Sequence, residues 1–182
     1  MAYPTRQARR TWTDWAFGSE VRSGKNWSMF FGRIALGFLF LWGGYQKILT
    51  QLGGKSATTG FLSGASVAGS PFAGFFNSLA GNGVAESLVV YGELLIGISL
   101  LLGVATRLGS ISGAVMMLVF TVAMWPIADA AGANPLVDYR VIYGLMFAMF
   151  FFLRPGRFLG VDGVLSRTKL VERFPAANWI LG

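Results

Sequence analysis

The stretch VAESLVVYGELLIGISLLLGVA, residues 84–105, decides the class of structure. It is long and apolar enough to cross a bilayer as a helix, which takes about 20 residues. Glu93 lies near its middle, where inserting a carboxylate costs roughly 2.5–3.5 kcal/mol. A carboxylate at that depth is therefore expected to have a partner or a function inside a helical bundle.

Three further apolar stretches have the length of membrane spans. The predicted fold class is an all-α integral membrane protein, a four-transmembrane-helix bundle with spans at residues 27–49, 84–105, 108–128 and 137–153. The membrane domain is predicted to cover residues 27–165. Residues 1–26 form an N-terminal tail, and residues 166–182 form an interfacial C-terminal tail.

The composition agrees with this class and excludes several kinds of chemistry. The 182 residues are 54% hydrophobic and 13% charged, whereas an average soluble chain carries about 25% charged residues. The chain has no cysteine and no histidine. It therefore cannot hold a disulfide, a thiolate zinc site, an iron–sulfur cluster or a histidine-ligated haem. No metal ligands are predicted, so a redox metal centre would belong to a partner subunit.

The net charge of +7 is concentrated in the two tails, next to apolar spans. Lysine and arginine gather on the cytoplasmic side of membrane proteins. We therefore predict a multi-pass protein of the cell membrane with both termini cytoplasmic. This explanation needs no nucleic-acid partner, and the predicted partners are the lipid bilayer and other membrane subunits.

The first outer loop, residues 50–83, is long enough to have structure of its own. Ser70-Pro71 has the pattern of a helix start, and Gly81-Asn82-Gly83 has that of a stop. Between them, aromatic and apolar residues recur with helical spacing: Phe72, Phe75, Phe76 and Leu79. The pattern predicts an amphipathic helix on the outer membrane surface or capping the bundle. Residues 53–69 are predicted to be flexible.

Helix depth suggests how the intramembrane charges are arranged. Glu86 and Glu93 are two turns apart, so they share one helix face. Lys47 is predicted to lie at the depth of Glu86 and to pair with it at the outer mouth of the bundle. Arg33 lies deeper, so a bridge from Arg33 to Glu93 requires extended side chains or an intervening water.

These residues predict an internal polar crevice that opens toward the outer side. Its predicted lining is Trp42, Tyr45, Gln46, Lys47, Tyr91 and Glu93. Such a crevice suits a quinone head group, because the carbonyls need donors, the ring needs aromatic walls and a carboxylate exchanges protons. The alternatives are a structural charge network that fixes helix register, and a path for protons or ions.

Two smaller patterns have simpler explanations. Ala105, Gly109 and Gly113 form a ladder of small residues that predicts close helix packing. Asp129, Asn134 and Asp138 have side-chain oxygens that suit a hard cation. A turn around Asn134-Pro135 is the simpler explanation for these residues.

Four segments in the right order carry a resemblance to a known family: RIALGFLFLWGGYQKIL (33–49), YGELLIGISLLLGVATRLGS (91–110), NPLVDYRVIYG (134–144) and RPGRFLGVDGVL (154–165). Together they resemble the DoxX family of small four-helix membrane proteins, which includes the DoxD-type large subunit of thiosulfate:quinone oxidoreductase. The resemblance spans about residues 28–165. By motif match, it implies functional positions at Arg33, Lys47, Glu93, Arg107, Arg157 and Asp162.

For DoxD-like members, the resemblance implies oxidation of thiosulfate to tetrathionate, with electrons passed to a membrane quinone and a smaller subunit as partner. The sequence thus predicts a DoxX-like membrane subunit that takes part in quinone-linked electron transfer. Glu93, Lys47 and Arg33 are the predicted catalytic residues, and Trp42, Tyr45, Gln46 and Tyr91 are predicted to bind the quinone. The alternative is a non-catalytic accessory or assembly subunit of a larger respiratory or energy-converting complex.

Overall fold

The computed structural model describes residues 24–126, 137–168 and 177–181, and all regular structure within these ranges is helical. The long helices are α2 (Gly24–Leu52), α6 (Gly83–Leu102), α7 (Thr106–Ala123) and α8 (Tyr139–Leu153). The short ones are α3 (Thr59–Leu62), α4 (Ala65–Ala68), α5 (Ala73–Ser78), η3 (Pro155–Arg157), α9 (Val161–Leu165) and α11 (Ala177–Ile180). The predictions for residues 1–23, Asp129 and Asn134 lie outside the described residues.

Three of the long helices, α2, α6 and α7, are long and apolar enough to cross a membrane. The fourth, α8, is apolar but has only 15 residues, fewer than the roughly 20 that a span needs. Large apolar side chains are exposed along all four, among them Phe38, Leu95, Leu118 and Leu145. Water-soluble proteins rarely expose apolar surface on this scale. The outer surface is therefore suited to lipid.

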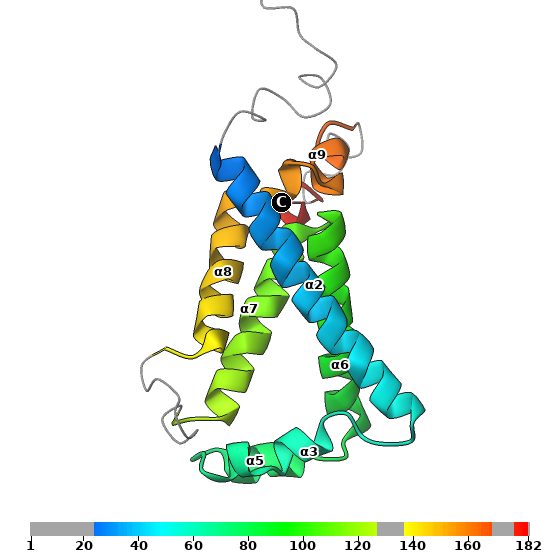
Figure 1. Ribbon diagram of the computed structural model, residues 1–182, viewed down its shortest axis with the longest axis vertical. Coiled ribbons are helices and arrows are strands. Elements are labelled where there is room, and N and C mark those ends of the chain that lie inside the picture. Colours follow the sequence, from blue (N-terminus) through cyan, green and yellow to red (C-terminus); the bar gives the residue numbers. More distant parts are fainter. Residues whose placement is uncertain (1–23, 127–136, 169–176, 182) are drawn as a thin grey trace, which may run out of the picture.

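The long helices form two tightly packed pairs, α2 with α6 and α7 with α8 (Figure 1). Glycines allow the close approach in each pair. A Cβ on Gly44 of α2 would lie 2.7 Å from the backbone nitrogen of Leu94, and one on Gly97 of α6 would meet the backbone of Leu41. In membrane bundles, small residues let helix backbones approach in this way.

The two pairs meet at one end of the molecule and diverge toward the other (Figure 1). We call the end where η3 and α9 lie the tail pole, and the end formed by residues 53–82 the loop pole. At the loop pole, α3 and α5 lie across the space between the diverging pairs (Figure 1).

The predicted ladder of small residues does pack closely. A Cβ on Gly109 would collide with the side chain of Ser99 in α6, and one on Gly113 would collide with the ring of Phe147 in α8. Gly109 and Gly113 thus let α7 contact both of its neighbours, as predicted. Ala105 instead lies just before α7, in the left-handed conformation with φ 48°.

The second span ends earlier than predicted, at Leu102 rather than residue 105. Gly103 adopts the left-handed conformation, with φ 64°, and its backbone N–H bonds to the carbonyl of Leu100. The N–H of Val104 bonds to the carbonyl of Ser99. These reversed bonds end the helix, and α7 begins at Thr106, two residues before the predicted start of the third span.

The first loop differs from its prediction in two ways. Residues 53–69, predicted to be flexible, contain α3 and α4, and the predicted amphipathic helix is reduced to α5. The hydroxyl of Ser70 accepts a hydrogen bond from the N–H of Phe72 and donates one to the carbonyl of Val122 in α7. The loop also forms a hydrophobic cluster with the end of α7, made of Leu62, Val67, Phe76 and Ala123. Burial against α7 therefore orders the loop.

Part of the C-terminal segment returns to the bundle at the tail pole. The guanidinium carbon of Arg107, in α7, lies 4.4 Å from the ring centre of Phe151 in α8 and 5.4 Å from that of Trp179 in α11. Leu181 is buried. The described end of the predicted interfacial tail thus packs on protein.

Candidate functional site: a cavity at the loop pole

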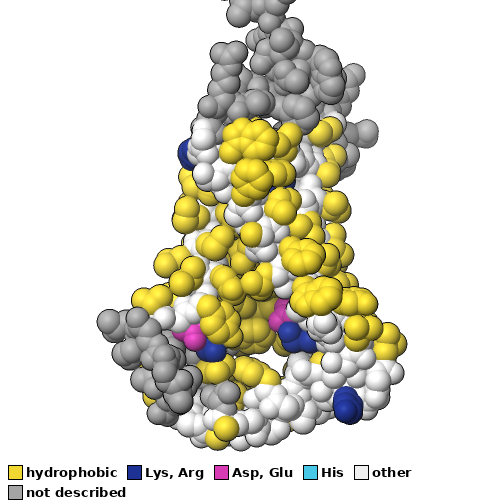
Figure 2. Space-filling model, in the orientation of Figure 1, with side chains coloured by type: hydrophobic (Ala, Val, Ile, Leu, Met, Phe, Trp, Pro, Cys, Tyr) yellow, Lys and Arg dark blue, Asp and Glu magenta, His cyan; other side chains and the backbone are white. Residues whose placement is uncertain are grey.

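A cavity of about 460 Å³ lies between the two helix pairs at the loop pole. Its lining comes from four long helices and the first loop: Leu39, Phe40, Gly43, Lys47, Ala57, Thr58, Phe61, Leu62, Phe76, Leu79, Ala85, Val89, Glu93, Met117, Val119, Phe120, Ala123, Tyr139, Arg140 and Tyr143. Figure 2 shows a hollow between the helix pairs, with acidic and basic side chains on both sides of it. The cavity exists because the two pairs diverge.

One wall of the cavity carries an ion pair between Lys47 of α2 and Glu93 of α6. The Nζ of Lys47 donates to Oε2 of Glu93 at 2.5 Å, and the Glu93 side chain is only 9% exposed. The carboxylate at the middle of the second span therefore has the partner that its insertion cost requires.

The predicted pairing of Lys47 with Glu86 is wrong, and the register of α2 against α6 explains why. Because Gly44 lies against Leu94, Lys47 is about 3 Å along the helix axis from Glu93 and about 7.5 Å from Glu86. The prediction aligned the two helix ends at the same depth. In the structure the start of α6 at Gly83 lies about 4.5 Å farther toward the loop pole than the end of α2 at Leu52, because they lie eleven and eight residues from the Leu94–Gly44 contact.

Glu86 instead holds the first loop. Its carboxylate accepts hydrogen bonds from the hydroxyl of Ser56 at 2.9 Å and from the backbone N–H of Ala57 at 2.6 Å. Both glutamates of α6 are buried, but Glu86 does not line the cavity. Glu86 thus fixes the loop that covers the cavity, and Glu93 faces the cavity itself.

The opposite wall carries Arg140, in the first turn of α8, which is 6% exposed. Its Nη2 lies 3.5 Å from Oδ2 of Asp138, and its guanidinium carbon lies 4.9 Å from the ring centre of Tyr139. Asp138 also caps α8 by accepting a hydrogen bond from the backbone N–H of Arg140 at 2.8 Å. The start of α8 thus places a buried cation on the cavity wall.

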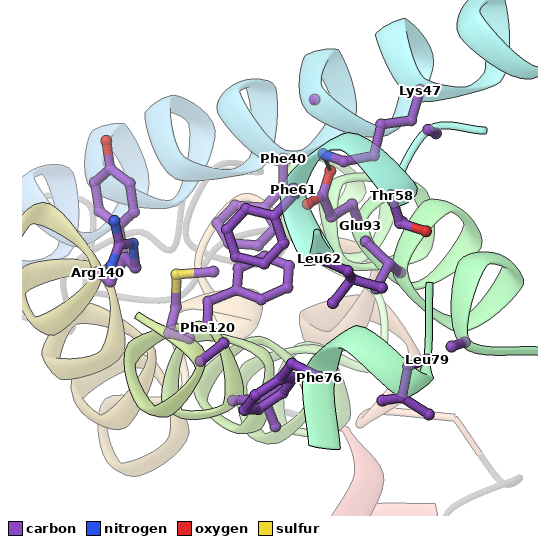
Figure 3. A pocket seen from close by; sticks show the side chains of 18 of the residues that line it. Phe40, Lys47, Thr58, Phe61, Leu62, Phe76, Leu79, Glu93, Phe120 and Arg140 are labelled. Atoms are coloured by element: carbon purple, nitrogen blue, oxygen red, sulfur yellow. Dashed lines mark hydrogen bonds and ion pairs between the residues drawn. The ribbon is translucent and has the colours of Figure 1, made fainter. Parts of the chain in front are cut away.

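Aromatic rings lie between the two charged walls. Figure 3 shows Phe40, Phe61 and Phe120 between Arg140 at one side and the Lys47–Glu93 pair at the other. The Phe61 and Phe120 ring centres are 5.6 Å apart. Phe40 packs edge-on against Phe147 of α8, with ring centres 5.1 Å apart. The cavity is therefore apolar and aromatic between two polar ends.

The four residues predicted to bind the quinone do not line the cavity. Trp42, Tyr45, Gln46 and Tyr91 are all exposed on the outer surface of the α2–α6 pair. Each residue turns a helix by about 100°, so Tyr45 and Tyr91 point about 200° away from Lys47 and Glu93 respectively. The prediction assumed that residues close to Lys47 and Glu93 in the sequence point toward the same space. Their predicted role in binding finds no support in this geometry.

The same periodicity would have pointed to some of the residues that were missed. Phe40 and Gly43 precede Lys47 by seven and four residues, so all three share one helix face. Phe120 and Tyr143 come from helices whose approach to α2 no sequence pattern shows. Arg140 was not singled out as a candidate, although a basic residue in the first turn of an apolar helix was a visible signal.

Arg33 is not brought together with Glu93. It is completely buried at the tail pole, where its guanidinium donates to the carbonyl of Pro155 at 3.2 Å and that of Leu159 at 3.0 Å. A Cβ on Gly103 would collide with its Nη1. Of the three residues predicted to be catalytic, only Lys47 and Glu93 share a site.

Asp162 lies beside Arg33 and is also fully buried. Its carboxylate accepts from the backbone N–H groups of Ala105 and Thr106 at 2.7 and 2.9 Å, and from the hydroxyl of Thr106 at 2.7 Å. It thereby caps the N-terminus of α7 from a distant point in the chain, since α7 has no side-chain cap of its own. We call Arg33, Gly103, Thr106 and Asp162 the arginine–aspartate cluster.

The chemical capacities of the two sites differ. In the arginine–aspartate cluster, backbone groups and Thr106 bind the Nη atoms of Arg33 and the carboxylate of Asp162, and the cavity does not reach these side chains. In the cavity, a carboxylate, an ammonium and a guanidinium border a space of ligand size. Among the described residues, no group of acidic side chains is placed to hold a metal ion.

The fold and the cavity define a multi-pass membrane protein, a helical bundle with a cavity between its helix pairs. The sequence model of the DoxX family matches residues 28–125, more than half of the chain, and the protein belongs to this family. The match covers α2 through α7 and includes Lys47 and Glu93. It ends before α8, so Arg140 and Asp162 lie outside it. No curated protein and no solved structure matches the chain significantly.

Proposed function

We propose that this DoxX-family protein binds a membrane quinone in the cavity and takes part in quinone-linked electron transfer as one subunit of a larger assembly. The observation that carries the proposal is the Lys47–Glu93 ion pair, whose carboxylate is buried and which faces an aromatic cavity of about 460 Å³. Ligand sites typically enclose about 300–1,000 Å³ and combine apolar walls with a few convergent polar groups.

The residues present fit a quinone. Lys47 and Arg140 supply hydrogen-bond donors for its two carbonyl oxygens, and Phe40, Phe61 and Phe120 supply apolar faces for its ring. Bound there, a quinone would accept two electrons and two protons. Glu93 is the group in the cavity that gives and takes a proton, and Lys47 balances its charge.

The electrons would come from outside the chain, since it has no cysteine or histidine to hold a redox metal. Thiosulfate is the proposed donor. Two thiosulfate ions joined as tetrathionate release two electrons, which with two protons convert the quinone to the quinol. A smaller partner subunit would carry the thiosulfate chemistry.

The proposed membrane arrangement has four spans, with α8 as the fourth. Two observations support α8 as the fourth span. It packs along α7, which is long enough to span, and Arg154 and Arg157 follow its end near the tail pole. Basic flanks mark the cytoplasmic side, so both termini are proposed to be cytoplasmic. The short helices α3 to α5 would then lie at the outer surface.

The test is quinone binding by the purified protein in lipid nanodiscs, measured as ligand-dependent thermal stabilisation. Glu93→Gln should weaken binding about tenfold or more, because the ion pair is lost and Lys47 is left unbalanced. Tyr91→Phe is the control, because Tyr91 is an exposed polar residue of the same helix that does not line the cavity. Equal effects of the two changes, or no binding by the parent protein, would exclude the proposed site.

A second candidate function is an accessory subunit without a reaction of its own. The absence of cysteine and histidine and the aromatic residues in the long tails favour it. On this view, native complexes purified without the chain keep their specific activity but lose stability. Loss of quinone-dependent activity on removing the chain, restored by adding the parent protein but not Glu93→Gln, would favour the first function.

A further inference from the structure

We propose that the ligand enters the cavity sideways from the lipid, through an opening between α2 and α8, and that an apolar tail of the ligand stays in this opening. The inference rests on the proposed function and specifies the ligand: a lipid-soluble quinone with a hydrocarbon tail.

The contact between α2 and α8 stops partway along the two helices. Near the tail pole, Gly32 faces Phe150, so that a Cβ on this glycine would lie 3.6 Å from the phenylalanine ring. Farther along, Phe40 packs on Phe147. From this aromatic pair toward the loop pole, the same face of α2 no longer contacts α8. Its residues Gly43 and Lys47 line the cavity instead. The packing that closes the bundle at the tail pole thus ends at Phe40.

Residues of both helices lie on the cavity wall and on the outer surface at the same time. Leu39 of α2 lines the cavity and is 43% exposed, and Tyr139 of α8 lines it and is 56% exposed. A side chain that belongs to both surfaces marks the rim of an opening. Figure 2 shows the corresponding hollow between the helix pairs.

This opening faces the hydrocarbon region of the membrane. Leu39 lies 13 positions before the end of α2 at Leu52, about 20 Å along the helix axis. The same two helices carry exposed apolar side chains in this region, including Phe38, Trp42, Ile142 and Leu145. A molecule that passes through the opening therefore comes from lipid.

The end of the cavity toward the loop pole is covered. The loop helices lie across it (Figure 1), and Leu62, Val67 and Phe76 pack there against Ala123 of α7. Glu86 holds the preceding loop segment through Ser56 and Ala57. The cover separates the cavity from water, which favours the lateral route.

Gly43 makes the charged wall accessible from this route. It lies one turn from Leu39 on the same helix face, and a Cβ at this position would be 3.0 Å from Oε2 of Glu93 and 3.9 Å from Nζ of Lys47. Without a side chain here, the ion pair faces the space behind the opening. A head group can thus approach the pair while its tail lies over Leu39.

The chain has no cysteine, so a single introduced cysteine can be labelled selectively. We would label Leu39→Cys with pyrene maleimide and measure binding of two quinones in nanodiscs, one without a tail and one with a long isoprenoid tail. Phe38→Cys, exposed on the same helix but outside the cavity lining, is the matched control. Val119 of α7 also lines the cavity and is 43% exposed, so Val119→Cys tests entry beside α7 instead.

The label at Leu39 should weaken binding of the long-tailed quinone about tenfold or more and leave the tail-less quinone within about twofold. The label at Phe38 should affect neither quinone. Unchanged binding of the long-tailed quinone, an equal loss for both quinones, or a selective loss with the label at Val119 alone would overturn the α2–α8 route. If the unlabelled protein binds neither quinone, the proposed function itself is wrong.

Discussion

Arg33 and Lys47 are basic residues of the same helix, α2, but their surroundings differ. The guanidinium of Arg33 is completely buried, and it donates to the backbone carbonyls of Pro155 and Leu159. The ammonium of Lys47 pairs with Glu93, and both side chains border a cavity. Arg33 belongs to the pole where the helices converge, and Lys47 to the pole where they diverge.

The comparison separates two uses of buried charge. In the arginine–aspartate cluster, the charged side chains hydrogen-bond to backbone groups of other segments. The charges there hold together parts of the chain that are distant in sequence. In the cavity, the partner of each charge is another side chain, and a ligand can compete for it. A buried charge in a membrane protein indicates function most strongly when it borders a space.

The largest effect is expected for Asp162→Ala. The change leaves the N–H groups of Ala105 and Thr106 without their acceptor and removes the negative charge beside Arg33. Removing one partner from a buried charged group costs about 3–5 kcal/mol. Thermal unfolding in detergent, followed by circular dichroism, measures the loss. Asp162→Asn, which keeps one acceptor oxygen, should lose less, and parent-like unfolding of Asp162→Ala would refute the capping role.

The second prediction sets the two basic residues of α2 against each other. Arg33→Met should lower the free energy of unfolding by about 1–3 kcal/mol, because two buried carbonyls lose their donor. Lys47→Met should cost a comparable amount, because it leaves the buried Glu93 carboxylate without its partner. The two variants should differ in quinone affinity, which Lys47→Met should lower and Arg33→Met should leave unchanged. Unfolding and binding measured on both variants give the answer, and equal changes in affinity would remove the distinction between the poles.

A smaller effect is expected from filling the space beside the ion pair. Gly43→Ala should weaken quinone binding several-fold, because its methyl group would stand 3.0 Å from the Glu93 carboxylate. Gly32→Ala on the same helix adds a methyl group that meets only ordinary contacts, the nearest at 3.6 Å, and should leave binding unchanged. Nanodisc titrations compare the two. Equal affinities would show that access past Gly43 does not matter.

The smallest effect is expected for Trp179→Ala, which tests how firmly the C-terminal segment closes the tail pole. Its ring lies 5.4 Å from the Arg107 guanidinium and is half exposed. An exposed cation–π contact contributes about 0.5–1 kcal/mol, so the unfolding temperature should fall slightly and quinone binding should not change. A loss of binding would instead connect the two poles.

The sequence predicted the elements better than their contacts. The spans at 27–49 and 84–105 match α2 and α6 within about three residues at each end, because long apolar runs mark them. The short helix α5 was visible in the spacing of its phenylalanines. The helices α3 and α4 were not, since their sequences gain order only by packing against α7.

The candidate site was predicted in part. Glu93 was identified because a carboxylate within an apolar run is costly, but Lys47 was assigned to Glu86 instead. Whether Lys47 pairs with Glu86 or Glu93 depends on the register of α2 against α6. That register is set by Gly44 and Gly97, where the backbones of the two helices are in contact. The aromatic lining depends on helix rotation, which also follows from packing.

By itself, the sequence determined that this chain lies in a membrane as a helical bundle and that Glu93 needs a partner. Apolar length and the cost of a buried charge are local properties, and they can be read from one segment at a time. Only the tertiary structure decided that Arg33 and Lys47 serve different poles, that Arg140 faces Glu93 across a cavity, and that the cavity has a rim at Leu39. These facts depend on where helices converge and diverge, and many weak contacts between distant segments set that together.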